Sequence, residues 1–116
     1  MSEIKKQIIE AAQDKKAKNI VSIDMSSAEG AICDWFIVCN ADSTTQVVAI
    51  ADGIDEKLEV EFGERVIRIE GRENGLWVVM DYGDIMVHIF QTEARDFYTL
   101  ESLWSDQPSE FHAYEE

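Results

Sequence analysis

The ten residues DYGDIMVHIF, from Asp81 to Phe90, combine two aspartates and a histidine within a short apolar run. Paired carboxylates are typical of metal-assisted phosphoryl transfer, and a histidine beside a cysteine is typical of a nucleophile–base couple. The rest of the sequence supports neither chemistry, because it contains no glycine-rich phosphate loop, no basic phosphate clamp and no motif linking His88 to a cysteine. We therefore predict no catalytic, cofactor-binding or metal-binding residue. A metal-dependent nucleotidyltransferase or hydrolase that uses Asp81 and Asp84 is the alternative from the class of enzymes.

Two strands are predicted around Tyr82-Gly83, which separates LWVVMD at 76–81 from DIMVHIF at 84–90. A two-residue loop with glycine second favours a tight β-hairpin, and this register places Asp81 opposite Asp84. Because alternate residues point to opposite faces, one face is wholly aliphatic and is predicted to be core. The other face has the composition of an interface hot spot. Its predicted partner-binding residues are Trp77, Val79, Asp81, Asp84, Met86, His88 and Phe90.

Two opposed aspartates in this hairpin would destabilise the sheet by roughly 0.2–1 kcal/mol. Their repulsion requires a compensating cation, which a basic partner, Arg95 or a metal ion would supply. Each feature also has a purely structural interpretation. A helix of the same chain would cover Trp77 and Phe90, His88 would be a hydrogen-bonded sheet residue, and the aspartates would flank a turn. The sequence leaves these alternatives open.

Apolar periodicity predicts one compact α/β domain, of the α+β type, with helices flanking a mixed sheet of about five strands in the order αββαβββα. Expected helices span 3–17, 44–60 and 93–104, and expected strands span 19–24, 33–40, 65–71, 76–81 and 84–90. The nearly all-apolar strand at 33–40 is predicted to be central and covered on both faces. Residues 1–104 form the predicted domain, and residues 105–116 are expected to be a flexible acidic tail.

Composition restricts the class of partner. The 116 residues include 24 acidic and 10 basic ones, and the resulting net charge of −14 disfavours direct nucleic-acid binding. A basic protein partner is favoured, because opposite net charges steer association. The basic run at 15–18 is expected only to complement the end of the first helix.

The N-terminal sequence has no apolar stretch for a signal peptide or membrane span, so the cytoplasm is the expected location. Cys33 and Cys39 are expected to be buried thiols.

Three segments carry a family resemblance. DYGDIMVHIF and EARDFYTLESLW lie within 81–104, DWFIVCNADSTTQVVAIAD spans 34–52, and EGRENGLWVVMDYGD spans 70–84. Together they resemble the ribosomal silencing factor family, also called RsfS or Iojap, and the string from Asp81 to Trp104 is the most specific part of the likeness. One departure is the loop from Asn40 to Ser43, which lacks the family's usual glycine, so Ser43 is interpreted as a helix cap.

The resemblance implies a translational repressor that is not an enzyme. Members of the family bind the large ribosomal subunit through the ribosomal protein L fourteen, on the face where the small subunit docks, and so block subunit joining when nutrients are scarce. The resemblance also implies a nucleotidyltransferase-like fold without catalytic carboxylates, and a homodimer off the ribosome. A dimeric adaptor for another basic protein is a further alternative.

The resemblance also extends the set of candidate residues. Tyr82 joins the partner-binding set, in which Trp77 and Tyr82 are the expected anchors. The closing helix contributes residues that are expected to support this site, and Arg95 among them is expected to pair with a nearby carboxylate. These supporting residues are Arg95, Tyr98, Glu101 and Trp104.

Overall fold

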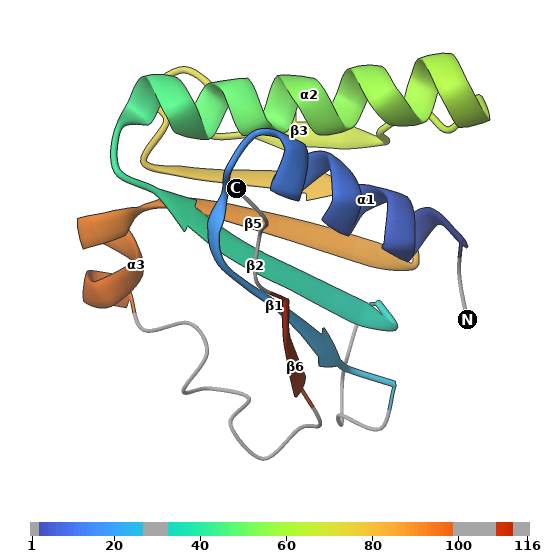
Figure 1. Ribbon diagram of the computed structural model, residues 1–116, viewed down its shortest axis with the longest axis horizontal. Coiled ribbons are helices and arrows are strands. Elements are labelled where there is room, and N and C mark those ends of the chain that lie inside the picture. Colours follow the sequence, from blue (N-terminus) through green and yellow to red (C-terminus); the bar gives the residue numbers. More distant parts are fainter. Residues whose placement is uncertain (1–2, 27–32, 99–108, 113–116) are drawn as a thin grey trace.

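The computed structural model describes residues 3–26, 33–98 and 109–112, which form one sheet with helices against it (Figure 1). Helices α1 and α2 lie side by side across one face of the sheet, and α3 lies at one end of the parallel strand pair. The elements in chain order are α1 (Glu3–Asp14), β1 (Lys18–Asp24), β2 (Trp35–Ala41), α2 (Thr44–Phe62), β3 (Arg68–Glu70), β4 (Trp77–Asp81), β5 (Ile85–Gln91), α3 (Thr92–Tyr98) and β6 (Ser109–His112).

The sheet is mixed, as the sequence predicts. Its strand order is β3-β4-β5-β2-β1-β6, and β2 and β5 are parallel whereas the other neighbours are antiparallel. The sixth strand adds to the five that the sequence indicated. It lies in the segment expected to be a flexible tail, where Ser109–His112 pair with β1. For these four residues the prediction of an irregular tail is therefore wrong.

Two apolar clusters stabilise the sheet from its two faces. The larger cluster joins α1 and α2 to the sheet, with Ile8, Ile54 and Leu58 at 0% exposure. The smaller cluster lies on the opposite face around Phe36 and Phe90. All but the first residue of β2 are buried, which confirms the prediction of a central strand covered on both faces. Both cysteines are free and buried, as expected.

The N-terminus of α2 is capped as the sequence predicts. The backbone N–H of Gln46 donates to Oγ of Ser43 at 3.1 Å, which satisfies one of the amide groups that a helix start leaves unpaired. At the other end, Gly63 adopts a left-handed backbone with φ of 69° and donates to carbonyls of the last turn. Local sequence thus fixes both ends of the longest helix.

The basic run at 15–18 does not end α1, contrary to the prediction. The helix ends at Asp14, and its last turn contains no basic residue. Lys16 has a φ of 63°, which reverses the chain into β1. Lys18 lies in β1, where its ammonium group pairs with the exposed carboxylate of Asp42 at 2.7 Å.

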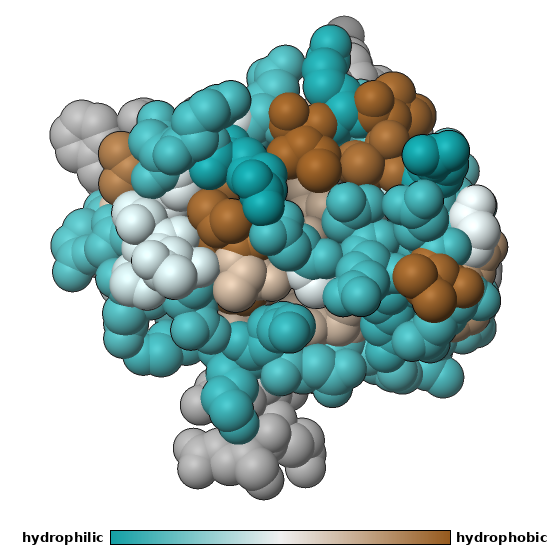
Figure 2. Space-filling view, turned by 90° about the horizontal axis from the view of Figure 1, so that it is seen from above, coloured by the Kyte–Doolittle hydropathy of each residue, from teal (hydrophilic) through white to brown (hydrophobic). Residues whose placement is uncertain are grey.

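Helix α3 is described from Thr92 to Tyr98, and the rest of the helix predicted at 93–104 lies outside the described residues, with Glu101 and Trp104. Among the described helices, none is long and apolar enough to cross a membrane. Hydrophilic side chains cover most of the α2 side of the molecule, and hydrophobic side chains emerge between them (Figure 2). Among the described residues, Ile67 is a large hydrophobic residue with 68% exposure.

Candidate partner-binding site

The β4–β5 hairpin differs from its predicted register by two residues. Tyr82 and Ile85 belong to the ladder, since the N–H of Tyr82 donates to the carbonyl of Ile85 at 2.9 Å. The turn is therefore Gly83-Asp84, with Gly83 at a φ of 90°. A shift by an even number of residues keeps every side chain on its predicted face. The observed pairs are Trp77 with Phe90, Val79 with His88, and Asp81 with Met86.

The two aspartates consequently do not oppose each other, and the like-charge argument is wrong. Oδ1 of Asp81 accepts a hydrogen bond from the N–H of Gly83 at 2.8 Å, so this carboxylate stabilises the turn. Asp84 is exposed within the turn. Arg68 lies opposite Asp81 across the β3–β4 ladder and places a cation on the same face. Arg95 follows β5 at its other end, about 20 Å away along the strand, so it does not compensate these charges.

An aromatic cluster lies on the predicted partner-binding face. Nε1 of Trp77 donates to Nδ1 of His88 at 3.1 Å, and the rings of Trp77 and Phe90 stack with centroids 5.0 Å apart. Phe36 contributes from β2, with its ring centroid 4.7 Å from that of His88. His88 is only 5% exposed and Phe90 0%. The prediction that His88 and Phe90 present an open surface is therefore wrong, because β2 and Ala94 of α3 pack around this cluster.

The protonation state of His88 follows from these contacts. Burial lowers the pKa of His88 to about 4, so the imidazole is neutral at pH 7. Because Nδ1 accepts the indole hydrogen bond, the ring proton is on Nε2. Nε2 is buried and has no hydrogen-bond partner within the described part of the chain. The histidine is thus a sheet residue with one satisfied nitrogen.

We expect His88 to make folding pH-dependent. Its native pKa lies below that of the unfolded chain, so below about pH 6.5 the unfolded state binds a proton that the native state does not. The contribution of His88 to the free energy of unfolding is therefore highest above about pH 6.5, and it decreases as the pH falls toward the native pKa of His88. Urea unfolding should show that the free energy of unfolding is about 1 kcal/mol lower at pH 5.5 than at pH 7. His88→Phe should remove this contribution. Equal pH dependence in both proteins would contradict this assignment.

Tyr82 lies on the opposite face from the one predicted. Its even number places it with Val78 and Met80, and its ring packs against the cluster under α1 and α2. Burial raises the pKa of the Tyr82 hydroxyl, and the nearby Asp55 adds to the effect. The hydroxyl oxygen is buried without a hydrogen-bond partner among the residues described. Tyr82 is half-buried and does not share a face with Trp77, so the two predicted anchors do not form one surface.

Four residues of the predicted site are partly exposed on one face of the hairpin. Asp84 adds an exposed carboxylate in the adjoining turn, and Arg68 and Glu70 of β3 extend the face with side chains that are 66% exposed. The partly exposed apolar side chains thus have charged neighbours along one edge. We call these four residues the ribbon face: Trp77, Val79, Asp81 and Met86.

Arg95 has a structural role, as expected. Its guanidinium is buried, and Nη1 donates to the backbone carbonyl of Asn19 and to Oδ1 of Asn40, both at 2.7 Å. Both of these contacts are to uncharged oxygens, and the pairing of Arg95 with a carboxylate stays a prediction. Asn40 also donates to Oγ1 of Thr92 at 3.0 Å, which ties the end of β2 to the start of α3. Arg95 and Asn40 therefore fix α3 against the sheet.

Sequence reasoning missed a buried lysine. Lys5 is 4% exposed, and its ammonium group lies 3.8 Å from the ring centroid of Trp35, which is a cation–π geometry. Lys5 is four residues before Ile9 and seven before Ala12, so helical periodicity places it on the buried face of α1. This spacing could have predicted its burial from the sequence. Within the described ranges, no group of three or more His, Cys, Asp or Glu side chains is placed to hold a metal ion.

Comparison with known proteins assigns the family. The model of the RsfS family, described as "Ribosomal silencing factor during starvation", matches residues 1–116. The chain is 40% identical over 101 residues to the ribosomal silencing factor RsfS of Halalkalibacterium halodurans, covering 87% of this chain and 85% of that protein. The chain belongs to the ribosomal silencing factor family.

Two further similarities support this assignment. A crystal structure of a Chromobacterium violaceum protein matches with a TM-score of 0.85 and 38% identity, covering 97% of this chain and 94% of that one. The chloroplastic protein Iojap of Zea mays is 33% identical over 72 residues, which cover 62% of this chain and 31% of that protein. The resemblance to silencing factors and the predicted α/β fold are thus confirmed. The family name describes a factor that silences ribosomes.

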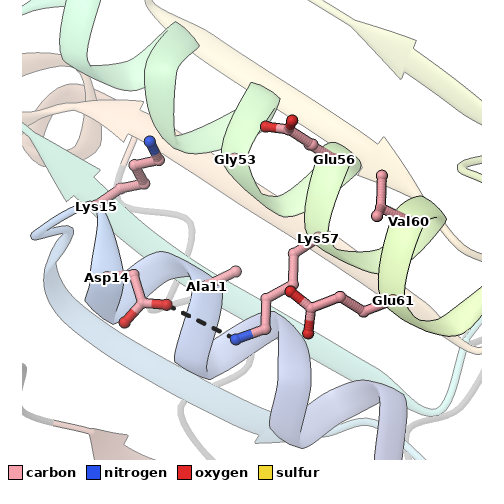
Figure 3. Close-up of a pocket in the computed structure, with 8 residues that line it drawn as sticks. All are labelled: Ala11, Asp14, Lys15, Gly53, Glu56, Lys57, Val60 and Glu61. Atoms are coloured by element: carbon pink, nitrogen blue, oxygen red, sulfur yellow. Dashed lines mark ion pairs between the residues drawn. The ribbon is translucent and has the colours of Figure 1, made fainter.

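This silencing factor also has a groove of about 260 Å³ between α1 and α2 (Figure 3). Charges of both signs line it, and Lys57 bridges the carboxylates of Glu10 and Asp14 at 3.7 Å each. Lys15 crosses the groove beside Gly53 of α2, where an added Cβ would lie 2.7 Å from Cε of Lys15. The mixed charges and the close lysine–glycine contact indicate that this groove is part of the packing interface between α1 and α2, which ion pairs stabilise.

We expect Gly53→Ala to stabilise this silencing factor by ~0.5–1 kcal/mol, because alanine restricts the unfolded chain and favours a helix interior. The new methyl group meets only the side chain of Lys15, from Cγ to Cε, and this flexible chain can move aside. Urea unfolding measures the change. A Lys15→Ala background is the control, since the gain there should be at least as large; a loss of stability in that background would refute the explanation.

Proposed function

We propose that this protein represses translation by docking its ribbon face on the ribosomal protein L fourteen of the large subunit, and so prevents the small subunit from joining. Membership of the silencing factor family supports the ribosomal role. The observation that carries the choice of face is the partly exposed Trp77, held by His88 and stacked on Phe90. A rigid, partly exposed aromatic side chain is typical of a binding hot spot.

Charge supports a basic protein as the partner. The net charge of −14 attracts a basic ribosomal protein and repels the surrounding RNA, which restricts the orientations in which the factor docks. Asp81 and Asp84 place carboxylates at the tip of the ribbon face for such a partner. The two charges act at the rim, where they favour a fast approach more than tight binding.

Size supports a steric mechanism. The molecule measures 33 × 33 × 28 Å along its principal axes, so a factor docked through one face adds almost 30 Å of rigid protein above the subunit surface. A second subunit cannot approach through that volume. The mechanism needs no chemical step, and we propose that the protein acts without enzymatic activity.

Sucrose-gradient sedimentation with purified subunits tests the proposal. The protein should sediment with the large subunit alone, should not sediment with the small subunit alone, and should reduce the amount of joined ribosomes when both are present. Unchanged joining in the presence of saturating protein would refute the steric mechanism. A pull-down with isolated ribosomal protein L fourteen then tests the proposed partner.

The same preparation tests two accompanying proposals. We propose a homodimer off the ribosome, which light scattering after size exclusion measures. The rival enzymatic function requires a nucleotide and a divalent metal, and a bound ligand would raise the unfolding temperature. We expect no thermal shift with nucleotide and magnesium or manganese, and a reproducible shift would favour the enzyme.

A further inference from the structure

Trp77 is held in one orientation by two contacts from β5. Its Nε1 donates to Nδ1 of His88 at 3.1 Å, and its ring stacks on Phe90 with an interplanar angle of 27°. A hydrogen bond at one edge and a stacked ring on one side together define both side-chain torsions of a tryptophan. Trp77 is therefore already ordered on the ribbon face of the isolated protein.

His88 is itself fixed by its surroundings. Its ring lies 4.7 Å from that of Phe36 and 6.5 Å from that of Phe90, and the side chain is 5% exposed. Neighbouring strands β2 and β4 flank it on both sides. The acceptor for the Trp77 indole thus belongs to the rigid part of the sheet and does not move with the surface.

A histidine at this place is costly for the fold. Its Nε2 is buried and without a partner among the described residues, and an unsatisfied buried polar atom destabilises the native state. A phenylalanine would fill the same space among Phe36 and Phe90 without that penalty. What a phenylalanine lacks is the ring nitrogen that accepts the indole hydrogen bond of Trp77.

We propose that His88 is a positioning residue for partner binding, which holds the indole of Trp77 in its docking orientation before the partner arrives. This proposal rests on the function proposed above. A side chain that is already ordered loses less conformational entropy on binding, so affinity increases without a new contact to the partner. His88 acts only through Trp77, because its own side chain is buried.

His88→Phe tests the proposal, because it keeps an aromatic ring and removes the acceptor. Large-subunit binding should weaken about fivefold to tenfold, the range expected when one side chain is no longer ordered before binding, while the variant is at least as stable as the native protein. The indole N–H resonance of Trp77 should shift in the nitrogen–proton NMR spectrum. His88→Asn is the rescue variant, because Oδ1 of asparagine replaces Nδ1, and it should restore part of the shift and of the affinity.

A double-mutant cycle with Trp77→Phe separates positioning from a general structural role. Phenylalanine at position 77 has no indole N–H, so His88→Phe should change affinity less than about twofold in that background. Trp77→Phe alone should weaken binding by a similar factor to His88→Phe. An equal effect of His88→Phe in both backgrounds, or native affinity of Trp77→Phe, would overturn the proposal.

The same measurements distinguish the two proposals from each other. If the native protein does not bind the large subunit, the proposed function fails, and positioning for that partner fails with it. If the native protein binds and His88→Phe binds equally well with a shifted indole resonance, only the positioning role of His88 is overturned.

Discussion

Replacing Trp77 with alanine is expected to weaken binding to the large ribosomal subunit by ~2 kcal/mol or more, which is about thirtyfold in affinity. Trp77 is the largest side chain of the ribbon face, and its ring is ordered by Phe90 at 5.0 Å before any partner binds. Truncation removes both the contact area and this preorganisation. Co-sedimentation with purified large subunits over a range of concentrations measures the loss.

Ile67→Ala is the matched control for this experiment. Ile67 is 68% exposed, lies just before β3 and is not one of the four residues of the ribbon face. This variant should bind as the native protein does. Circular dichroism on both variants separates a lost contact from a lost fold. Native affinity of a folded Trp77→Ala would count against the ribbon face as the docking surface.

Gly71→Ala is expected to have the largest effect on the fold, a decrease of ~4 kcal/mol or more in the free energy of unfolding. Gly71 has a φ of 85°, a conformation that side chains rarely adopt. An added Cβ would lie 2.0 Å from the backbone carbonyl oxygen of Trp77, which cannot move without opening the β3–β4 hairpin. Urea unfolding followed by circular dichroism measures the change.

Gly63→Ala separates backbone strain from this steric clash. Gly63 also has a positive φ, 69°, but an added Cβ would meet nothing within 4 Å. Only the conformational cost of about 1 kcal/mol is then expected. Similar destabilisation by the two variants would show that the approach of Gly71 to Trp77 is not as close as the structure indicates.

Face membership in the β4–β5 hairpin could be predicted from sequence alone. A strand alternates faces at every residue, so Trp77, Val79, Asp81 and Met86 were placed together correctly although the register was not. The register failed because Tyr82-Gly83 was taken as the turn. In the structure Gly83 is the first turn residue, and its φ of 90° requires glycine at that place.

Burial of His88 and Phe90 could not be predicted from the hairpin sequence. His88 and Phe90 are covered because the parallel strand β2 brings Phe36 beside them and α3 brings Ala94. Phe36 is distant in sequence, and the strand order that places it beside β5 follows from packing of the whole sheet. Ala94 is close to Phe90 in sequence, but its position depends on how α3 packs against the end of β2. Tyr82 was misplaced for a related reason, because α2 offers its ring an apolar surface on the helix side.

The C-terminal segment shows the same limit. SEFH at 109–112 is polar and short, and nothing in its own composition predicts a strand. It becomes one because β1 leaves an open edge, whose backbone groups pair with it from Ile20 to Ile23. Strand formation here depends on the available edge more than on the propensity of the segment.

By itself, the sequence determined the α/β class, the central buried strand, the cap at Ser43, the buried thiols and the family. Each of these depends on local periodicity or on a specific string of residues. The tertiary structure alone decided which residues of the aromatic face stay accessible. Accessibility depends on neighbours supplied by strand order, which pairs β2 with β5, and by α3, which Arg95 holds against Asn40 of β2, 55 residues away in sequence.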